Sequence, residues 1–171
     1  MLNSEQIKKL IKEKNLIADY IDLETQLNAN GFDLTVSEIS GFNGAGSLDF
    51  SNSERIIPET KEMELKNKKA GDEYGWWFLS KGSYKVKTNE IISLPGSLAG
   101  FAFSRSSLLR MGAYCQNGFW DAGFSGKSEF LLMVDNPNGI NVKQNARLIQ
   151  IAFMSISETK NLYNGIYKNL E

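Results

Sequence analysis

Short apolar segments separated by turn residues fill most of the chain, and this pattern constrains the fold more than any other feature. Tyr84, Val86 and Thr88 alternate with Lys85 and Lys87, which predicts a half-buried strand. Other strands are predicted at residues 76–78, 91–94, 98–103, 130–134, 140–142 and 148–153. Many short strands and few helices indicate an all-β sandwich or barrel.

The first half of the chain contains one predicted helix and several irregular segments. Residues 3–14 are expected to form the helix, with Asn3 or Ser4 as its cap and apolar residues on one face. Short apolar stretches then alternate with polar ones up to Val36, and Gly31 interrupts this run. Residues 41–53 are rich in Gly, Ser and Asn and predict a loop or hairpin. The many charges at residues 58–75 indicate a solvated loop with a short strand.

Composition excludes several classes of site. The chain has 171 residues, enough for one domain with a real core, and 19 basic against 20 acidic residues leave a net charge of -1. This balance gives no sign of a nucleic-acid or membrane surface. There is one cysteine and no histidine, so a Ser-His-Asp triad, a Cys-His nucleophile and a zinc deaminase site are excluded. A lone cysteine and the lack of a signal peptide or membrane span lead us to expect a cytoplasmic protein.

The segment from Ser104 to Gly112 has the features of a phosphate-binding helix start. Serines are good helix N-caps, the leucines that follow suit a short helical turn, and Gly112 is a plausible stop. A helix start attracts anions through its unpaired N–H groups and its dipole. Arg105 and Arg110 add guanidinium groups that bind phosphate with paired hydrogen bonds. A capped surface turn without a ligand is the alternative interpretation.

A single carboxylate, Asp121, follows among glycines and aromatic residues between Gly118 and Gly126. A carboxylate in this setting can act as a general base. An Asp between glycines is also common as an ordinary turn residue. The residues alone leave both interpretations open.

Four motifs in order resemble the signature of the dUTPase and dCTP deaminase superfamily. They are Gly31-Phe32-Asp33-Leu34, the Arg-Ser-Ser-Leu motif from Arg105, the Gly-x-x-Asp-x-Gly-aromatic-x-Gly motif from Gly118, and Asn145 to Phe153. The residue sequence from Leu108 to Gly112 and the C-terminal segment Tyr163-Asn164-Gly165-Ile166-Tyr167 resemble the archaeal dUTPase branch most closely. The resemblance implies a mainly β, jelly-roll-like dUTPase barrel with a short N-terminal helix and one short helix after the Arg-Ser-Ser motif. It also implies a homotrimer with active sites at subunit interfaces, and Asp33 in a supporting role.

The resemblance implies hydrolysis of dUTP to dUMP and pyrophosphate. Asp121 occupies the position of the base that activates water, and Mg²⁺ is carried by the triphosphate rather than by a protein metal site. Base selection resembles backbone pairing to a hairpin at about Cys115 to Trp120. The substrate-binding residues that the resemblance implies are Arg105, Ser106, Ser107, Arg110, Gly118, Gln150, Tyr163, Tyr167 and Lys168.

Two alternative functions remain open. The same family includes zinc-independent dCTP deaminases, which place a glutamate on the strand after Gly126. Glu129 is the candidate here, although those deaminases carry the glutamate two residues later, where this chain has Leu131. Residues 129 and 131 share a strand face, so Glu129 is not excluded, and a bifunctional enzyme is also open. The second alternative is a non-catalytic, nucleotide-binding jelly-roll domain in which Asp121 is dispensable.

The tail at residues 160–171 departs from the Gly-rich lid of standard dUTPases. We expect it either to close over the nucleotide through Tyr163, Tyr167 or Lys168, or to remain disordered.

Overall fold

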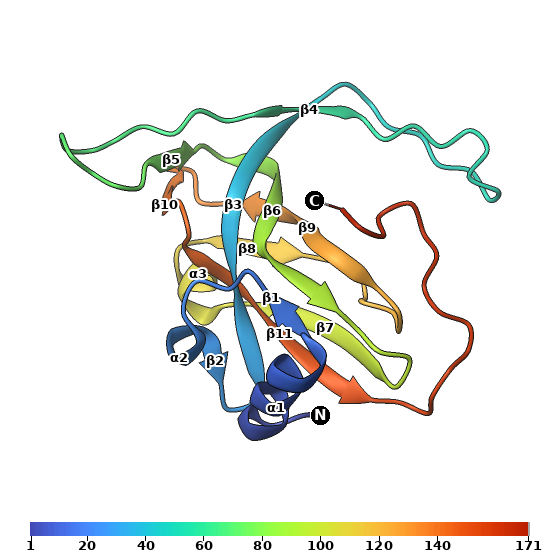
Figure 1. Ribbon diagram of the computed structural model, residues 1–171. Helices are drawn as coiled ribbons and strands as arrows, with labels where there is room; N and C mark the ends of the chain where they lie inside the picture. The colour runs from blue at the N-terminus through green and yellow to red at the C-terminus, as the bar shows by residue number, and fades with distance from the viewer. Residues whose placement is uncertain (171) are drawn as a thin grey trace.

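One long strand organises the molecule. β3 (Gly31–Asn43) runs through the centre of the computed structural model, which describes residues 1–170 (Figure 1). Its first part, residues 32–35, pairs with β11 (Arg147–Ser155). Its second part, residues 36–41, pairs with β6 (Gly82–Ser93). Because β3 changes partner along its length, it joins two halves of one sheet.

The other strands extend this sheet or form a small second one. The main sheet has the order β7-β11-β3-β6-β9-β8, with β1 on β6 and with β2 and β4 on β3, and β10 pairs with β5 in a separate ribbon. The bounds are β1 (Ile17–Ala18), β2 (Leu27–Asn28), β4 (Glu59–Glu62), β5 (Trp76–Leu79), β7 (Leu98–Ser104), β8 (Ala113–Gln116), β9 (Ser125–Val134) and β10 (Ile140–Lys143).

The two ends of the main sheet, β7 and β8, are brought together into a nearly closed barrel. The Ser104 hydroxyl accepts a hydrogen bond from the Cys115 amide at 2.7 Å and donates one to the Cys115 carbonyl at 3.2 Å. Gly100 forms an antiparallel bridge with Trp120. Closing the barrel removes exposed strand edges, and it encloses a core that includes the fully buried Phe32 and Phe153. The mainly β, barrel-like fold expected from the sequence is therefore confirmed.

Three helices accompany the strands in the part of the chain that the structure describes: α1 (Ser4–Lys14), α2 (Leu23–Gln26) and α3 (Ser106–Arg110). α1 begins at a capping box made by Asn3 and Gln6, and it ends at Asn15 in the left-handed conformation. Its buried residues Ile7 and Ile11 share one face, which confirms the predicted N-terminal helix. No helix among residues 1–170 is long and apolar enough to cross a membrane.

Some element boundaries differ from the predicted ones. Gly31, which interrupts the run of apolar and polar stretches in the sequence, is the first residue of β3. It is required there because a Cβ would lie 2.6 Å from the Ile151 carbonyl oxygen. The strand predicted at residues 130–134 begins at Ser125, and β3 continues to Asn43, into the segment expected to be a loop or hairpin. The rest of that segment does form a hairpin arm, closed by the Ser47–Ile56 bridge.

Candidate active site

Three charged side chains meet where α3 begins. The buried carboxylate of Asp33 lies 3.0 Å from Nε of Arg105 and 3.3 Å from Nη1 of Arg147. Nη1 of Arg147 also donates to the Thr25 carbonyl at 2.6 Å. Burial raises the pKa of Asp33, and the positive charges of Arg105 and Arg147 oppose that rise. The cluster places two half-buried guanidinium groups at the helix start.

The predicted helix after the Arg-Ser-Ser motif is present, but no serine caps it. Arg105 is the N-cap and its side chain makes no capping bond. Ser104 is unavailable because its hydroxyl bonds the backbone of Cys115. Leu108 is buried and anchors the helix, which leaves the neighbouring predicted binding residues Ser106, Ser107 and Arg110 exposed to solvent. Gly112 follows the helix with a φ of 73°, as expected for a residue that ends it.

Gln150 lies on β11, on the strand that joins the charged cluster to β7. It stands opposite Asp33 on β3 and opposite Phe103 on β7, and it is half-buried. Its position on β11 groups it with the cluster and α3, because Arg105 donates its amide hydrogen to the Leu148 carbonyl on the same strand. The Arg105, Ser106, Ser107, Arg110 and Gln150 positions thus lie in one part of the fold.

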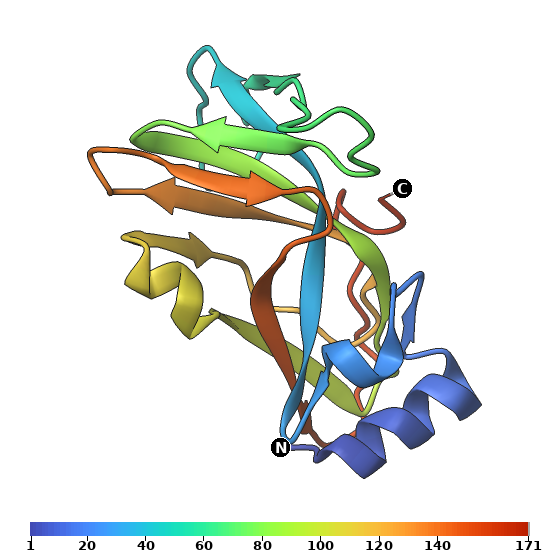
Figure 2. The same ribbon diagram turned by 90° about the vertical axis from the view of Figure 1, so that its left-hand side faces the viewer.

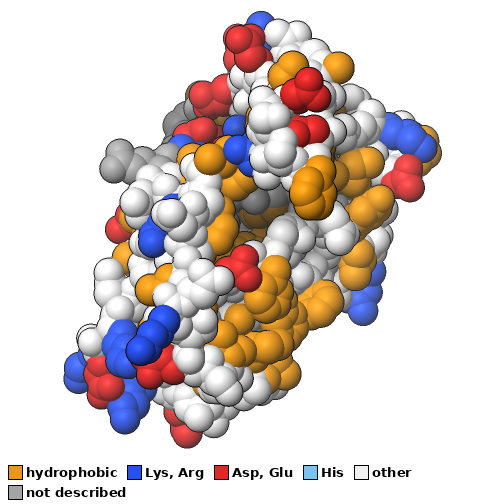
Figure 3. All heavy atoms as spheres, turned by 90° about the vertical axis from the view of Figure 1, so that its right-hand side faces the viewer, with side chains coloured by type: hydrophobic (Ala, Val, Ile, Leu, Met, Phe, Trp, Pro, Cys, Tyr) orange, Lys and Arg blue, Asp and Glu red, His pale blue; other side chains and the backbone are white. Residues whose placement is uncertain are grey.

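A cavity of about 350 Å³ lies on the other side of the barrel, between β9, the residues before Asp121 and the C-terminal tail. Its walls include the predicted residues Gly118, Glu129, Tyr163 and Tyr167. Hydrophobic side chains gather around a hollow on the face drawn in Figure 3. The volume is at the lower end of the range for small-molecule sites, and an apolar lining with few polar groups is typical of them.

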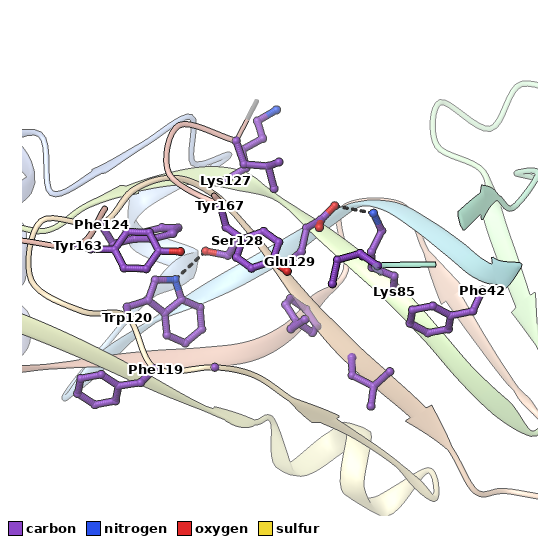
Figure 4. Close-up of a pocket in the computed structure, with 15 residues that line it drawn as sticks. Phe42, Lys85, Phe119, Trp120, Phe124, Lys127, Ser128, Glu129, Tyr163 and Tyr167 are labelled. Carbon is purple, nitrogen blue, oxygen red and sulfur yellow. Dashed lines mark hydrogen bonds and ion pairs between the residues drawn. The ribbon is translucent and has the colours of Figure 1, made fainter. Parts of the chain in front are cut away.

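Two polar pairs lie in the wall of this cavity (Figure 4). Nζ of Lys85 on β6 is 2.8 Å from Oε1 of Glu129 on β9, and both side chains are half-buried. The indole Nε1 of Trp120 donates to the hydroxyl of Ser128 at 2.9 Å. Glu129 therefore has a cationic partner beside the cavity.

Asp121 lies in the turn between Trp120 and β9, and its side chain is exposed. The turn is held by hydrogen bonds from the Phe124 amide to the Asp121 carbonyl and from the Gly123 amide to the Leu94 carbonyl, both at 3.0 Å. Asp121 borders a second cavity with Phe119 and Tyr163, which also line the first. Its carboxylate is thus accessible beside the aromatic pocket.

The C-terminal tail packs against the turn that carries Asp121 and against the start of β9. The Tyr163 amide donates to the Ala122 carbonyl at 2.8 Å, and the Tyr163 ring lies 5.6 Å from that of Phe124. Further along, the Lys127 amide donates to the Leu170 carbonyl at 2.8 Å. Lys168 points back into the tail, where its Nζ donates to the Tyr163 carbonyl, and it is not part of the cavity wall.

Within one chain the predicted site residues therefore fall into two groups. α3 and the tail lie on different sides of the molecule in two perpendicular views (Figures 1 and 2). Sequence reasoning did not select Lys85, Ser128 or Arg147 as site residues. Arg147 was visible in the last of the four motifs, whereas Lys85 and Ser128 carry no local signal. Among residues 1–170 no group of three or more His, Cys, Asp or Glu side chains is placed to hold a metal ion.

Comparison with known proteins agrees with this architecture. A family model described as dCTP deaminase-like matches residues 1–156. A Methanosarcina mazei protein named probable deoxyuridine 5'-triphosphate nucleotidohydrolase is 43% identical over 171 residues, covering 99% of this chain and 96% of the relative. A Methanocaldococcus jannaschii protein named deoxyuridine 5'-triphosphate nucleotidohydrolase is 41% identical over 145 residues, covering 85% of this chain and 88% of the relative.

Relatives named as deaminases are more distant. A Persephonella marina protein named dUMP-forming dCTP deaminase is 29% identical over 173 residues, covering 98% of this chain and 91% of the relative. The crystal structure of 2'-deoxycytidine 5'-triphosphate deaminase from Agrobacterium tumefaciens superposes with a TM-score of 0.65 at 21% identity, covering 91% of this chain and 47% of that one. This chain spans about half the length of that solved structure, and the likeness shows the shared fold. With its four motifs, its barrel and these matches, the chain belongs to the dCTP deaminase-like family.

Proposed function

We propose that this protein hydrolyses dUTP to dUMP and pyrophosphate. The observation that carries the proposal is the exposed carboxylate of Asp121 beside an aromatic cavity. The same chain presents Arg105 and Arg147 at the start of α3. The archaeal relatives named as dUTP nucleotidohydrolases support it.

The proposed mechanism uses groups of this chain in separate roles. Asp121 orients and deprotonates the water that attacks the α-phosphorus. Arg105 and Arg110, with Ser106, Ser107 and Gln150, hold the phosphates and stabilise the charge that develops. Gly118 and the tail residues Tyr163 and Tyr167 enclose the nucleoside in the cavity of about 350 Å³. Lys168 is the weakest member of the predicted set, because its amine is engaged within the tail.

Mg²⁺ fits this site as a partner of the substrate. It prefers phosphate oxygens and retained waters as ligands, so the triphosphate would carry it into the site and Asp121 would stay free to act as the base. When bound, the ion would neutralise phosphate charge and orient the leaving pyrophosphate.

A homotrimer would unite the two groups of residues that one chain separates. Large apolar side chains stay exposed around α3, where Phe103 is 66% and Leu109 is 54% accessible. Exposed apolar groups next to a polar site mark an interface, so we propose that the arginines of one subunit face the cavity of another. The single buried cysteine is compatible with the reducing cytoplasm, where we place the enzyme.

The ion pair between Lys85 and Glu129 argues for hydrolysis over deamination. Oε1 of Glu129 is engaged by the Lys85 ammonium group at 2.8 Å, so this carboxylate oxygen is directed to β6 rather than left free to contact a cytosine base.

Product analysis of the purified protein with dUTP and dCTP separately, each with Mg²⁺, tests the proposal. We expect dUMP and pyrophosphate from dUTP and intact dCTP. Ammonia from dCTP would instead identify a deaminase, and no reaction with either would identify a binding domain.

A further inference from the structure

Most of the buried polar residues described by the structure belong to one connected hydrogen-bond network. Among residues 1–170, seven polar or charged residues are buried. Hydrogen bonds of their side chains and backbone join all of these except Ser40; the six are Gln26, Asp33, Thr35, Thr88, Glu90 and Ser128. The network runs through the barrel, from the Asp33 cluster to the wall of the cavity. Buried polar groups cost free energy unless they are paired, so a continuous network in a core requires a physical reason.

Glu90 is at the centre of this network and is fully buried. Its Oε1 accepts from Nε2 of Gln26 at 2.7 Å and from the Thr35 hydroxyl at 2.6 Å, and its Oε2 accepts from the Thr35 amide at 2.9 Å. Nδ2 of Asn89 donates to the same Thr35 hydroxyl at 2.8 Å, so this hydroxyl bonds both Asn89 and Glu90. Burial raises the pKa of Glu90, and these hydrogen bonds oppose the rise. In each of these three contacts the Glu90 carboxylate accepts.

One end of the network reaches the arginine cluster. Nε2 of Gln26 also donates to the Asp33 carbonyl at 2.9 Å, and Oε1 of Gln26 accepts from the amides of Ile21 and Asp22 at the start of α2. The carbonyl of Thr25 in α2 accepts the 2.6 Å bond from Arg147. Glu90 thus holds both the strand that carries Asp33 and the helix that orients Arg147.

The other end reaches the cavity. The Thr88 hydroxyl donates to the Glu90 carbonyl and accepts from the Ser128 amide, both at 3.0 Å. The Ser128 hydroxyl accepts from the indole of Trp120, the residue before Asp121. The register of β6 and β9 shifts between Lys87 and Ile91, so residues 88–90 form a bulge that interrupts the ladder between these two strands. Side chains take over the positioning that ladder hydrogen bonds would provide.

We propose that Glu90 is a positioning residue that keeps the Asp33–Arg105–Arg147 cluster and the Trp120–Asp121 segment in a fixed relation across the barrel. The catalytic part of this inference rests on the proposed dUTP hydrolysis. Glu90 touches no substrate; it acts through Gln26 and Thr35 on one side and through Thr88 and Ser128 on the other.

The test compares Glu90→Gln and Thr88→Val with the wild type in the full-length chain. In either amide orientation, Glu90→Gln turns an NH₂ group toward a hydrogen-bond donor, and Thr88→Val removes one hydroxyl at nearly constant volume. We expect hydrogen exchange of the Trp120 indole N–H, followed by NMR, to accelerate about tenfold or more. We also expect the kcat for dUTP to fall about tenfold or more with little change in KM, because small misplacements of reacting groups are costly.

Two controls separate positioning from general destabilisation. The Trp77 indole donates to the Met63 carbonyl at 3.0 Å outside the network, so its exchange should stay unchanged in both variants. Ser40→Ala removes a buried hydroxyl outside the network. It should change neither the hydrogen exchange of the two indole N–H groups nor kcat. Equal acceleration of both indoles, or an unchanged Trp120 exchange, would overturn the inference, and so would an unchanged kcat in an active enzyme. If Glu90→Gln does not fold, Thr88→Val decides alone.

Failure of the proposed function gives a different result. A wild type that releases no dUMP contradicts the hydrolase proposal, whereas the contrast between the Trp120 and Trp77 indoles still tests the network without any substrate.

Discussion

Asp33 and Arg105 form a 3.0 Å ion pair in which the carboxylate is buried and the guanidinium is partly exposed. The arrangement leaves the carboxylate inside the barrel and directs the arginine to the start of α3. A guanidinium held in this way is oriented before any phosphate arrives, which lowers the entropic cost of binding an anion. Arg147 contacts the same carboxylate oxygen, so one buried residue orients two cations.

Replacing Asp33 with Asn should lower both stability and triphosphate binding. Two guanidinium groups would lose their buried counter-charge, and we expect a loss of about 3 kcal/mol, the lower end of the range for breaking a buried pair. Urea unfolding measures this loss, and calorimetric titration with a non-hydrolysable dUTP analogue measures the binding. Asp135→Asn is the matched control, because that aspartate forms an exposed ion pair with Lys81 and should cost less than about 1 kcal/mol. Equal stability losses in the two variants would show that Asp33 does not hold the arginines.

Replacing Asp121 with Asn tests the assigned base. The amide keeps the size of the side chain but cannot take a proton, so we expect turnover of dUTP to fall about 100-fold or more. Affinity for the non-hydrolysable dUTP analogue should stay within a few-fold of the wild type, because other residues bind its phosphates and its uracil ring. Steady-state kinetics measure the turnover of dUTP, and calorimetric titration measures the affinity for the analogue, with Asp135→Asn again as the control. Unchanged turnover in Asp121→Asn would exclude the assigned mechanism.

Much of the barrel could be predicted because its strands have one buried and one exposed face. The alternation around Val86 on β6 and the apolar run at β11 both indicate strands directly. Local signals also located α1 through Asn3 and the end of α3 through Gly112. What these signals share is that neighbours in sequence determine them.

The contacts between distant strands could not be predicted from local signals. The pair between Lys85 and Glu129 depends on the register of β6 against β9, which the bulge at residues 88–90 shifts. The hydrogen bond from the Cys115 amide to the Ser104 hydroxyl forms only when β7 and β8 meet in the closed barrel. Local sequence signals therefore could not show that this hydroxyl is unavailable to cap α3. Nothing in the sequence near Glu90 indicates that its carboxylate is buried among donors from β3 and α2.

Replacing Glu129 with Gln distinguishes hydrolysis from deamination. Lys85 already neutralises this carboxylate, so we expect dUTP turnover to stay within a few-fold of the wild type. The double variant Lys85→Met/Glu129→Gln removes the amine that the single change leaves unpaired, and it should behave in the same way. Coupled assays for pyrophosphate and for ammonia follow both reactions. Ammonia released from dCTP by the wild type and lost in Glu129→Gln would favour the deaminase.

Cys115 should be inert toward thiol reagents in the folded protein. Burial raises its pKa from 9.0 to about 12. Because the thiolate is the reactive form, this shift lowers its fraction roughly 1000-fold near pH 8. Reaction with a disulfide reagent, measured in buffer and again in guanidinium chloride, should be slow in the first and complete in the second. Rapid labelling of the folded protein would show that β8 opens more readily than its buried position indicates.

Gly123 should be required for docking of the tail. A Cβ there would lie 2.7 Å from the Cβ of Leu162, so an alanine would displace the tail next to Tyr163. Gly123 has a φ of 84°, and alanine at a left-handed position also costs about 1–2 kcal/mol in backbone strain. Gly71→Ala is the matched control, because Gly71 has a φ of 87° and nothing within 4 Å of a Cβ. We expect trypsin to cleave after Lys160 and Lys168 faster in Gly123→Ala alone, with a raised KM for dUTP if the tail encloses the nucleoside. Equal cleavage in the two variants would show that the contact between position 123 and Leu162 does not hold the tail in place.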